Sequence, residues 1–286
     1  MALLQIFDGQ LTAKQLQKYL FLFTREQSEK SFDFIPYFYG CFSFQANQDI
    51  STLSKYGYVS FTDSKIVLKQ NSDFISELDM FDQSYLRLIK EKYGHLTQDE
   101  LIKYTYENYP YYAINSKIAG QLLSEEDLEK IRKQKRKFSE PQLFSIGYEG
   151  ISLEKYINQL IIYDVHVLCD VRKNAYSQKY GFSKAQLQKA CEGVGIEYEH
   201  IPELGIESDN RRNLNSQKDY DLLFDDYEKT TLKSNESAIL YVLRIIQEKK
   251  RIALTCFEKN PKQCHRTRVA NEILKRVNLP FMLLNK

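Results

Sequence analysis

The sequence predicts an α/β protein in which a mainly helical domain precedes a Rossmann-like domain. Residues 142–286 alternate apolar, strand-like runs with amphipathic helices, which indicates βαβ units and a mostly parallel sheet. Residues 1–120 are rich in Tyr and Phe and combine helical patterns with one hairpin, which favours a winged-helix-like core. Residues 121–141 are strongly charged and are expected to form a helical linker.

The composition is that of an ordinary globular protein, and it excludes several other classes. Of the 286 residues, 43% are hydrophobic and 27% are charged, and the formal net charge is +2. Binding to nucleic acid therefore has to come from a local patch. No apolar run reaches the about 18–20 residues that span a bilayer, and the N-terminus lacks the basic region of a secretory signal. We therefore expect a cytoplasmic protein with no membrane partner, in which the five cysteines are free thiols.

The first half is expected to contain two groups of helices around a hairpin. Thr12 is a suitable N-cap for a helix in which apolar residues recur at helical spacing. A helix from Gln48 to Lys55 should follow, and then a hairpin of Tyr58–Phe61 and Lys65–Leu68. Residues 77–120 look helical again, and Thr97 forms a capping box with Glu100.

In the second half, strands and helices alternate regularly. The expected strands are Leu143–Ile146, His166–Val171, Glu197–Ile201, Ile252–Cys256 and Phe281–Leu284. The expected helices are Ser152–Tyr163, Ser183–Val194, Asn235–Lys249 and His265–Val277. Ser183 is a plausible N-cap. The segment of about thirty residues before Asn235 is expected to be a loop, and loops of that length often act as lids.

Three polar clusters follow three of these strands. They are Gly147-Tyr148-Glu149-Gly150, Cys169-Asp170-Val171-Arg172, and Cys256-Phe257-Glu258, which continues to Cys264-His265-Arg266. The carboxyl ends of parallel strands meet at one edge of a sheet, and ligands bind in the crevice there. The sequence therefore predicts a site at this edge.

The residue types at this edge favour binding of an anion. Asp170 and Arg172 face the same side of a strand, so they either grip a ligand together or form a structural ion pair. Cys264, His265 and Arg266 open a helix, whose N-terminus attracts anions and lowers the pKa of a thiol. Glu258 could act as an acid or base, or orient His265.

Cys256, Cys264 and His265 allow three interpretations. They could bind a soft metal ion with Asp170 as a fourth ligand, but this spacing is not a standard zinc pattern, so we expect no metal and no cofactor. Cys264 could instead be a nucleophile. All three could also be packed, structural residues.

The second half resembles the DUF488 family over about residues 142–278. The matching segments are SIGYEGISLEKYINQL, VLCDVRKNAYSQKYGFSKAQLQKACEGVGIEYEHIPELG and IALTCFEKNPKQCHRTRVANEIL. The resemblance implies a fold and a site rather than a reaction. It points to Asp170, Arg172, Ser177, Phe182, Cys256, Glu258, Cys264, His265 and Arg266. Tyr148-Glu149 departs from the family, since many relatives have a His-Ser-type pair there. The segment PYFYGCFSFQANQDISTLSKYGYV weakly resembles winged-helix-like domains of the SocA/Panacea type.

Two further groups of residues are candidates for contacts to nucleic acid. Lys133, Lys135, Arg136 and Lys137 lie in a basic stretch that either is a solvated helix end or contacts a nucleic-acid backbone. Arg211-Arg212 either lies in a solvated loop or clamps a phosphate, and Tyr37 or Tyr39 could stack on bases.

These observations predict a protein that acts on or binds DNA, RNA or a nucleotide-type anionic ligand at the carboxyl edge of the sheet. Arg172 and Arg266 would hold the anion, with Tyr148, Glu149, Ser177 and Cys256 beside it. Asp170, Glu258 and His265 would transfer protons, and Cys264 would be the nucleophile of a hydrolase or transferase. The alternatives are a non-catalytic DNA-binding regulator that senses a ligand, and an antitoxin-like interaction module.

Overall fold

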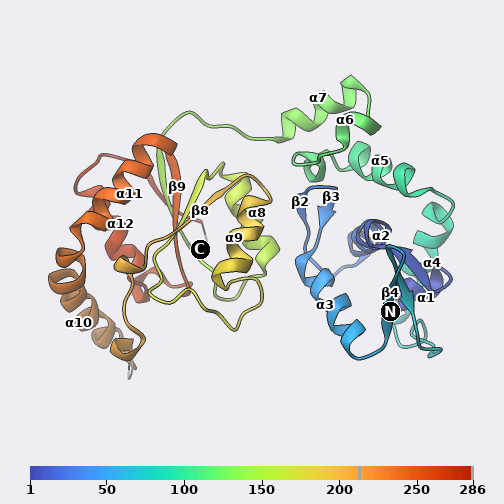
Figure 1. Ribbon diagram of the computed structural model, residues 1–286, viewed down its shortest axis with the longest axis horizontal. Helices are drawn as coiled ribbons and strands as arrows, with labels where there is room; N and C mark the ends of the chain where they lie inside the picture. Colours follow the sequence, from blue (N-terminus) through green and yellow to red (C-terminus); the bar gives the residue numbers. More distant parts are fainter. Residues whose placement is uncertain (212–213, 285–286) are drawn as a thin grey trace. The chain divides into compact units, whose positions relative to one another are not determined.

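The computed structural model describes residues 1–211 and 214–284. They divide into two compact units, Met1–Lys135 and Arg136–Lys286. The first runs from blue to green and the second from green to red in Figure 1.

A parallel sheet forms the centre of the C-terminal unit. In its described residues, the sheet has the strand order β10-β6-β9-β7-β8, and every neighbouring pair is parallel. The strands are β6 (Gln142–Gly147), β7 (Val167–Asp170), β8 (Glu197–His200), β9 (Arg251–Cys256) and β10 (Phe281–Leu283). The predicted α/β class is confirmed, and each predicted strand is found to within a residue at either end.

Helices cover both faces of this sheet. They are α8 (Leu153–Ile162), α9 (Lys184–Glu192), α10 (Gln217–Tyr227), α11 (Glu236–Lys249) and α12 (Arg266–Leu274). Figure 1 shows α8 and α9 on one face and α11 and α12 on the other. The apolar side chains of α11 and α12 pack with those of β7 and β9 in one core, which is why β9 is buried at every position.

The strand register brings the polar clusters together. Gly147 at the end of β6 pairs with Cys256 at the end of β9. On the other side of β9, Asp170 at the end of β7 pairs with Thr255 of β9. The three clusters therefore begin at adjacent positions of one sheet edge.

One prediction for this unit was wrong. The segment before α11 is not a loop: it contains α10, the short 3-10 helices η2 (Pro202–Leu204) and η3 (Ser208–Arg211), and a π-helical turn, η4 (Glu228–Leu232). Ser216 caps α10 in a capping box with Asp219, and Phe224 is buried in the core. Ser183 is the N-cap residue of α9, as predicted, but its side chain makes no cap hydrogen bond, because its hydroxyl accepts from the N–H of Ser177 and donates to the carbonyl of Ser177.

The N-terminal unit is mainly helical, with small antiparallel sheets. Its α-helices are α1 (Ala2–Ile6), α2 (Ala13–Glu26), α3 (Phe44–Lys55), α4 (Met80–Tyr93), α5 (Gln98–Asn108), α6 (Ala119–Leu122) and α7 (Glu125–Gln134), with a 3-10 turn, η1 (Pro110–Ala113). Its strands are β1 (Gln10–Thr12), β2 (Ile35–Tyr37), β3 (Gly40–Phe42), β4 (Val59–Thr62) and β5 (Lys65–Leu68). The predicted N-cap at Thr12 and the predicted capping box at Thr97 are both present, and Thr12 also forms a capping box with Gln15.

The predicted hairpin forms, and β1 pairs with it. β4 and β5 are antiparallel, and Asp63 and Ser64 turn the chain with positive φ angles of 46° and 68°. The order β1-β5-β4 gives a three-stranded sheet rather than a simple two-stranded wing. The winged-helix interpretation of this unit stays a prediction.

The basic stretch begins on a helix of the N-terminal unit. α7 lies inside the predicted linker, and its Ile131 packs with Ile102 and Tyr106 of α5. Beyond α7, the chain is exposed up to β6.

Two further findings concern the helices and the cysteines. Within residues 1–211 and 214–284, no helix combines the length and the apolar character that crossing a bilayer requires. All five cysteines are free thiols, and all are buried.

Candidate active site

Asp170 and Arg172 form a buried ion pair at the end of β7. The Asp170 side chain is fully buried and that of Arg172 is 5% exposed. Nε of Arg172 donates to Oδ1 of Asp170 over 2.8 Å, and its terminal nitrogen NH2 pairs with Oδ2. Tyr198 on β8 donates its hydroxyl to Oδ2 over 2.6 Å. The carboxylate outweighs the effect of burial on Arg172 and raises the pKa of the guanidinium.

The remaining donors of Arg172 also point to groups of the protein. NH1 donates to the hydroxyl of Tyr148 and to the carbonyl of Phe182, each over 2.8 Å. The rings of Tyr148 and Phe182 stack, with centroids 4.3 Å apart. This arrangement favours the structural ion pair among the interpretations of Asp170 and Arg172, and the catalytic role of Asp170 and the ligand-binding roles of Arg172 and Tyr148 stay predictions.

Arg266 and Glu149 hold the loop that leaves β9. Arg266 is 1% exposed, and its Nε donates to Oγ of Ser145 over 2.8 Å while NH1 donates to the carbonyl of Glu258. Oε2 of Glu149 accepts from the backbone N–H of Lys259 over 2.8 Å. Both side chains thus fix the backbone around Glu258, and their predicted ligand contacts are untested.

Cys256 and His265 form a close pair at the centre of the edge. Cys256 ends β9, and His265 is the N-cap residue of α12. Nδ1 of His265 lies 3.7 Å from Sγ of Cys256, and Nε2 lies 2.8 Å from the carbonyl oxygen of Val171. A carbonyl oxygen only accepts, so Nε2 carries a proton and Nδ1 is the nitrogen that can exchange a proton with the thiol.

Arg211 and Glu258 complete this group. Arg211 pairs with Oε1 of Glu258 through NH1, and its NH2 lies 2.9 Å from Nδ1 of His265. Oε2 of Glu258 lies 3.1 Å from Sγ of Cys256. Nε of Arg211 is buried and has no hydrogen-bond partner among the described residues. The guanidinium therefore has a donor left for a ligand.

These contacts separate the two thiols chemically. Burial would raise the pKa of Cys256, but the hydrogen bond from Cys264, the His265 imidazole and the Arg211 guanidinium outweigh it and lower that pKa well below its ordinary value. Burial and the hydrogen bond to Cys256 raise the pKa of Cys264. Burial acts to lower the pKa of His265, and the neighbouring Cys256 raises it overall. Burial also raises the pKa of Glu258. Of the two thiols, Cys256 is therefore the more acidic.

Among the described residues, Cys256, Cys264 and His265 form the group of side chains that could hold a soft metal ion. The ligand atoms of Cys256, Cys264 and His265 all lie within 4.8 Å of one another. Asp170, the fourth ligand considered from the sequence, is not part of this group.

A pocket of about 370 Å³ opens over Cys256 and His265. Its described lining residues include the cationic Arg172, Lys173, Lys179 and Arg211, and no Asp or Glu is among them. Tyr176 and Phe257 also line it, and their side chains are 72% and 41% exposed. The pocket thus combines positive charge, two exposed aromatic rings and the thiol of Cys256.

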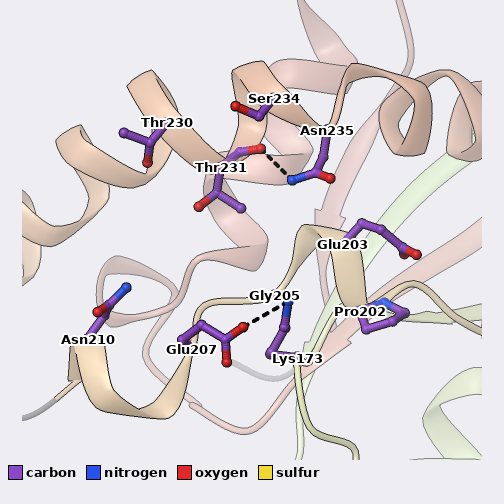
Figure 2. A pocket seen from close by; sticks show the side chains of 10 residues that line it. All are labelled: Lys173, Pro202, Glu203, Gly205, Glu207, Asn210, Thr230, Thr231, Ser234 and Asn235. Atoms are coloured by element: carbon purple, nitrogen blue, oxygen red, sulfur yellow. Dashed lines mark hydrogen bonds and ion pairs between the residues drawn. The ribbon is translucent and has the colours of Figure 1, made fainter.

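A second pocket, of about 430 Å³, shares Lys173 with the first (Figure 2). Figure 2 shows Lys173 paired with Glu207, at 2.9 Å, and the amide of Asn235 donating to the carbonyl of Thr231. Glu203 and Glu207 balance the charge of Lys173 in this lining. This pocket is therefore less suited to an anion than the first.

The other predicted residues lie in different places. Ser177 lines the first pocket, and its hydroxyl accepts from the N–H of Lys179. Cys264 is buried and is not among the described lining residues. Lys133, Lys135, Arg136 and Lys137 are exposed. Tyr37 and Tyr39 line a cavity of the N-terminal unit, and Arg212 lies outside the described residues.

Sequence reasoning missed Lys173, Lys179 and Tyr198. Lys173 directly follows the Asp-Val-Arg motif, and Lys179 lies in the loop between β7 and α9 that carries Ser177. Both could have been found by considering every cation in the loops at the carboxyl edge. Tyr198 lies within β8 and carries no such signal.

The comparisons with known proteins bear on the family of the C-terminal part of the chain. Residues 152–273 match the model of the family described as "Domain of unknown function DUF488". No match supports a resemblance of the N-terminal half to SocA/Panacea-type domains. No curated protein and no solved structure matches the chain. The matched residues include Asp170, Arg172, Cys256, Glu258, Cys264 and His265, so the predicted similarity of this part of the chain to the DUF488 family is confirmed.

Proposed function

We propose that the C-terminal unit is a thiol-dependent hydrolase or transferase that acts on a phosphate-bearing, nucleotide-type ligand. The observation that carries the proposal is the pair of Cys256 and His265 in the wall of a pocket with cationic side chains. Arg211 connects the Cys256–His265 pair to the pocket, because it contacts the imidazole and also lines the pocket.

The anion selectivity of the pocket follows from its charges. Arginine forks and lysine ammonium groups are the usual protein ligands of phosphate oxygens. In the described lining, Arg172 is engaged by Asp170, so Arg211 and Lys179 are the cations assigned to the phosphate group. Tyr176 and Phe257 offer exposed ring faces on which a base can stack.

The chemistry assigned to Cys256 is nucleophilic attack. The thiolate attacks the electrophilic centre of the bound ligand and expels the leaving group, and a covalent thiol-bound intermediate forms. In the catalytic step, NH2 of Arg211 turns from Nδ1 of His265 to the phosphate group, and Nδ1 of the protonated imidazole donates its proton to the leaving group while Nε2 keeps its hydrogen bond to Val171. Water or a second acceptor then releases the intermediate. The reaction requires a reduced thiol, as in the cytoplasm.

Calorimetric titration tests the ligand class. AMP should bind and adenosine should bind at least about tenfold more weakly, because only AMP carries the anion. Arg211→Gln should remove this difference, while Lys262→Gln, outside the described pocket lining, should keep it. Equal affinities for AMP and adenosine in the wild-type protein would contradict the assignment of a phosphate site.

Mass spectrometry of acid-quenched protein tests the thiol chemistry across a panel of nucleotides and nucleotide esters. A covalent adduct should appear on Cys256 in the wild-type protein and in Cys264→Ser, and it should be absent in Cys256→Ser. A metal assay on the same samples tests the competing interpretation, in which Cys256, Cys264 and His265 bind a metal ion. One tightly bound zinc ion per chain, lost in each of the three variants Cys256→Ser, Cys264→Ser and His265→Ala, would replace the nucleophile by a metal site.

The basic stretch supports a nucleic-acid form of the substrate. Lys130 and Arg132 are neutralised by acidic neighbours on α7, whereas Lys133, Lys135, Arg136 and Lys137 have no ion-pair partner in the described part of the chain. Replacing these four residues by Gln should weaken binding to single-stranded DNA or RNA and flatten its salt dependence by up to about three units of slope. An unchanged salt dependence of binding would exclude nucleic acid as the substrate, and a mononucleotide would remain as the proposed ligand.

A further inference from the structure

The N-terminal unit holds a lysine that is buried without a counter-charge. Lys18 lies on α2, and its side chain is 2% exposed. Its Nζ donates to the backbone carbonyl of Cys41 over 3.0 Å. The titratable groups that act on it are Cys41 and Lys14, and no carboxylate is among them in the described residues. A buried ammonium group without an anion is costly, so burial lowers the pKa of Lys18 and favours the neutral amine.

This amine lines a cavity of about 320 Å³ whose lining includes four aromatic residues. Tyr37, Phe38, Tyr39 and Phe42 contribute their rings from β2, β3 and the turn between them. Tyr39 is 43% exposed, and Nζ of Lys14 lies 4.3 Å from the centre of its ring. The volume is in the range of sites for small ring compounds.

The surrounding structure keeps the cavity in shape. The amide of Gln17 on α2 donates to the carbonyl of Ser43 over 3.1 Å and accepts from the N–H of Ser43 over 2.8 Å, which fixes the end of the β2–β3 hairpin on the helix. Gly40 has a φ of 90°, and a Cβ there would lie 2.4 Å from the ring of Tyr106 and 3.4 Å from Nζ of Lys18. The absence of a side chain at Gly40 therefore allows the ring of Tyr106 to pack directly against the turn beside the amine.

From this geometry we infer that Lys18 is a reactive amine that forms an imine with a small aromatic aldehyde or ketone held in the cavity. The nitrogen lone pair attacks the carbonyl carbon, a C=N bond replaces the C=O bond, and the carbonyl oxygen leaves as water. The reaction needs no oxidant or reductant and is reversible. When the imine is protonated, its N–H can still donate to the carbonyl of Cys41.

Trapping with sodium cyanoborohydride tests the inference on the full-length protein. Benzaldehyde and the reductant are added near pH 7, hydride transfer converts the imine into a stable benzyl amine, and peptide mass spectrometry locates it. A lysine with the ordinary pKa of about 10.4 is almost fully protonated at this pH. Lys18 should therefore be benzylated at least about tenfold faster than Lys14, which lies one turn earlier on the same helix. Faster labelling of Lys14 or of exposed lysines, with Lys18 unmodified, would overturn the inference.

A change in the cavity wall tests the preference for aromatic compounds without altering the amine. In Tyr39→Ala, labelling of Lys18 by benzaldehyde should fall relative to labelling by propanal, because a ring face is lost at the exposed rim. The matched variant Tyr56→Ala removes a tyrosine that is 73% exposed and is not in the described cavity lining, and it should leave the ratio unchanged. A ratio that is the same in Tyr39→Ala and the wild type would contradict an aromatic ligand.

Discussion

At the scale of single residues, the candidate site depends on how each arginine is used. Arg172 and Arg266 lie in the most conspicuous motifs, yet their donors point to Asp170, Phe182, Ser145 and the carbonyl of Glu258. Arg211 lies outside these motifs and has a donor left over. A motif shows where a guanidinium is needed, but only the contacts show whether it is already satisfied.

The choice between Cys256 and Cys264 as the nucleophile also depends on contacts that only the structure shows. The sequence locates Cys256, Glu258, Cys264 and His265 at one edge, because strand ends and helix starts can be recognised from periodicity. It does not tell which sulfur faces the imidazole. The 3.7 Å contact of Cys256 with His265 favours Cys256 over the predicted Cys264.

Removing the negative charge of Asp170 should destabilise the protein strongly. In Asp170→Asn, the guanidinium of Arg172 stays buried without its anion, which costs about 3–5 kcal/mol. The free energy of unfolding, measured in urea, should fall by this amount. Asp226→Asn, on the exposed side of α10, serves as a control and should change it little. A loss below about 1 kcal/mol for Asp170→Asn would show that the pair is not needed for stability.

The pH profile of alkylation should identify Cys256 as a thiolate paired with an imidazolium. Its pKa is lowered and that of His265 is raised, so the charged pair persists between these two values. The rate of Cys256 alkylation by iodoacetamide should therefore be flat from about pH 6 to 8, whereas an ordinary thiol loses about tenfold per unit below its pKa near 8.5. In His265→Ala, the rate at pH 6 should drop. A wild-type rate that falls tenfold per unit would exclude the ion pair.

At the scale of secondary-structure elements, regular periodicity was the reliable guide. β6, β7 and β9 are buried apolar runs, and α8, α11 and α12 carry one apolar stripe each, so all six were predicted. β1, β2 and β3 are three residues long and show no recognisable alternation, whereas β10, which is equally short, could be predicted because it follows a helix in the regular strand–helix pattern. α10 was missed because exposed residues such as Leu222 blur its apolar face.

Gly147 should be intolerant to substitution because two elements meet there. A Cβ at this position would lie 2.1 Å from the carbonyl oxygen of Glu258. Gly147→Ala should therefore cost roughly 1–3 kcal/mol and displace the loop after β9. Gly120→Ala is the control, since a Cβ there meets nothing within 4 Å and alanine favours the helix. If thermal unfolding shows equal stability for both variants, the close approach of β6 and the loop is wrong.

At the scale of the whole molecule, the order of strands and helices fixed the class of the C-terminal unit but left the N-terminal unit open. Five strands separated by helices allow few arrangements, and a parallel sheet with its ligand edge at the carboxyl ends is the commonest. The helices and short strands of the first unit allow many more. Helix boundaries there could be predicted from caps such as Thr97, but the packing could not.

Limited proteolysis should separate the two units. Lys135, Arg136 and Lys137 are exposed and lie outside helices and strands, between two compact units. Trypsin should therefore cut first at these residues and leave two fragments that resist further digestion. Mass spectrometry of the early products identifies the sites. First cuts inside residues 1–122 or 142–200 would contradict the division into units.

Protection of Cys256 by a nucleotide tests the central claim most directly, because it joins the thiolate to the anion pocket. The five cysteines are alkylated at pH 6.5 with and without saturating AMP, and the modified peptides are quantified. We expect Cys256 to react first and AMP to slow its modification at least about tenfold, with adenosine much less effective. First modification of Cys264, or an unchanged rate for Cys256 in the presence of AMP, would contradict a thiol-dependent site for nucleotide-type anions.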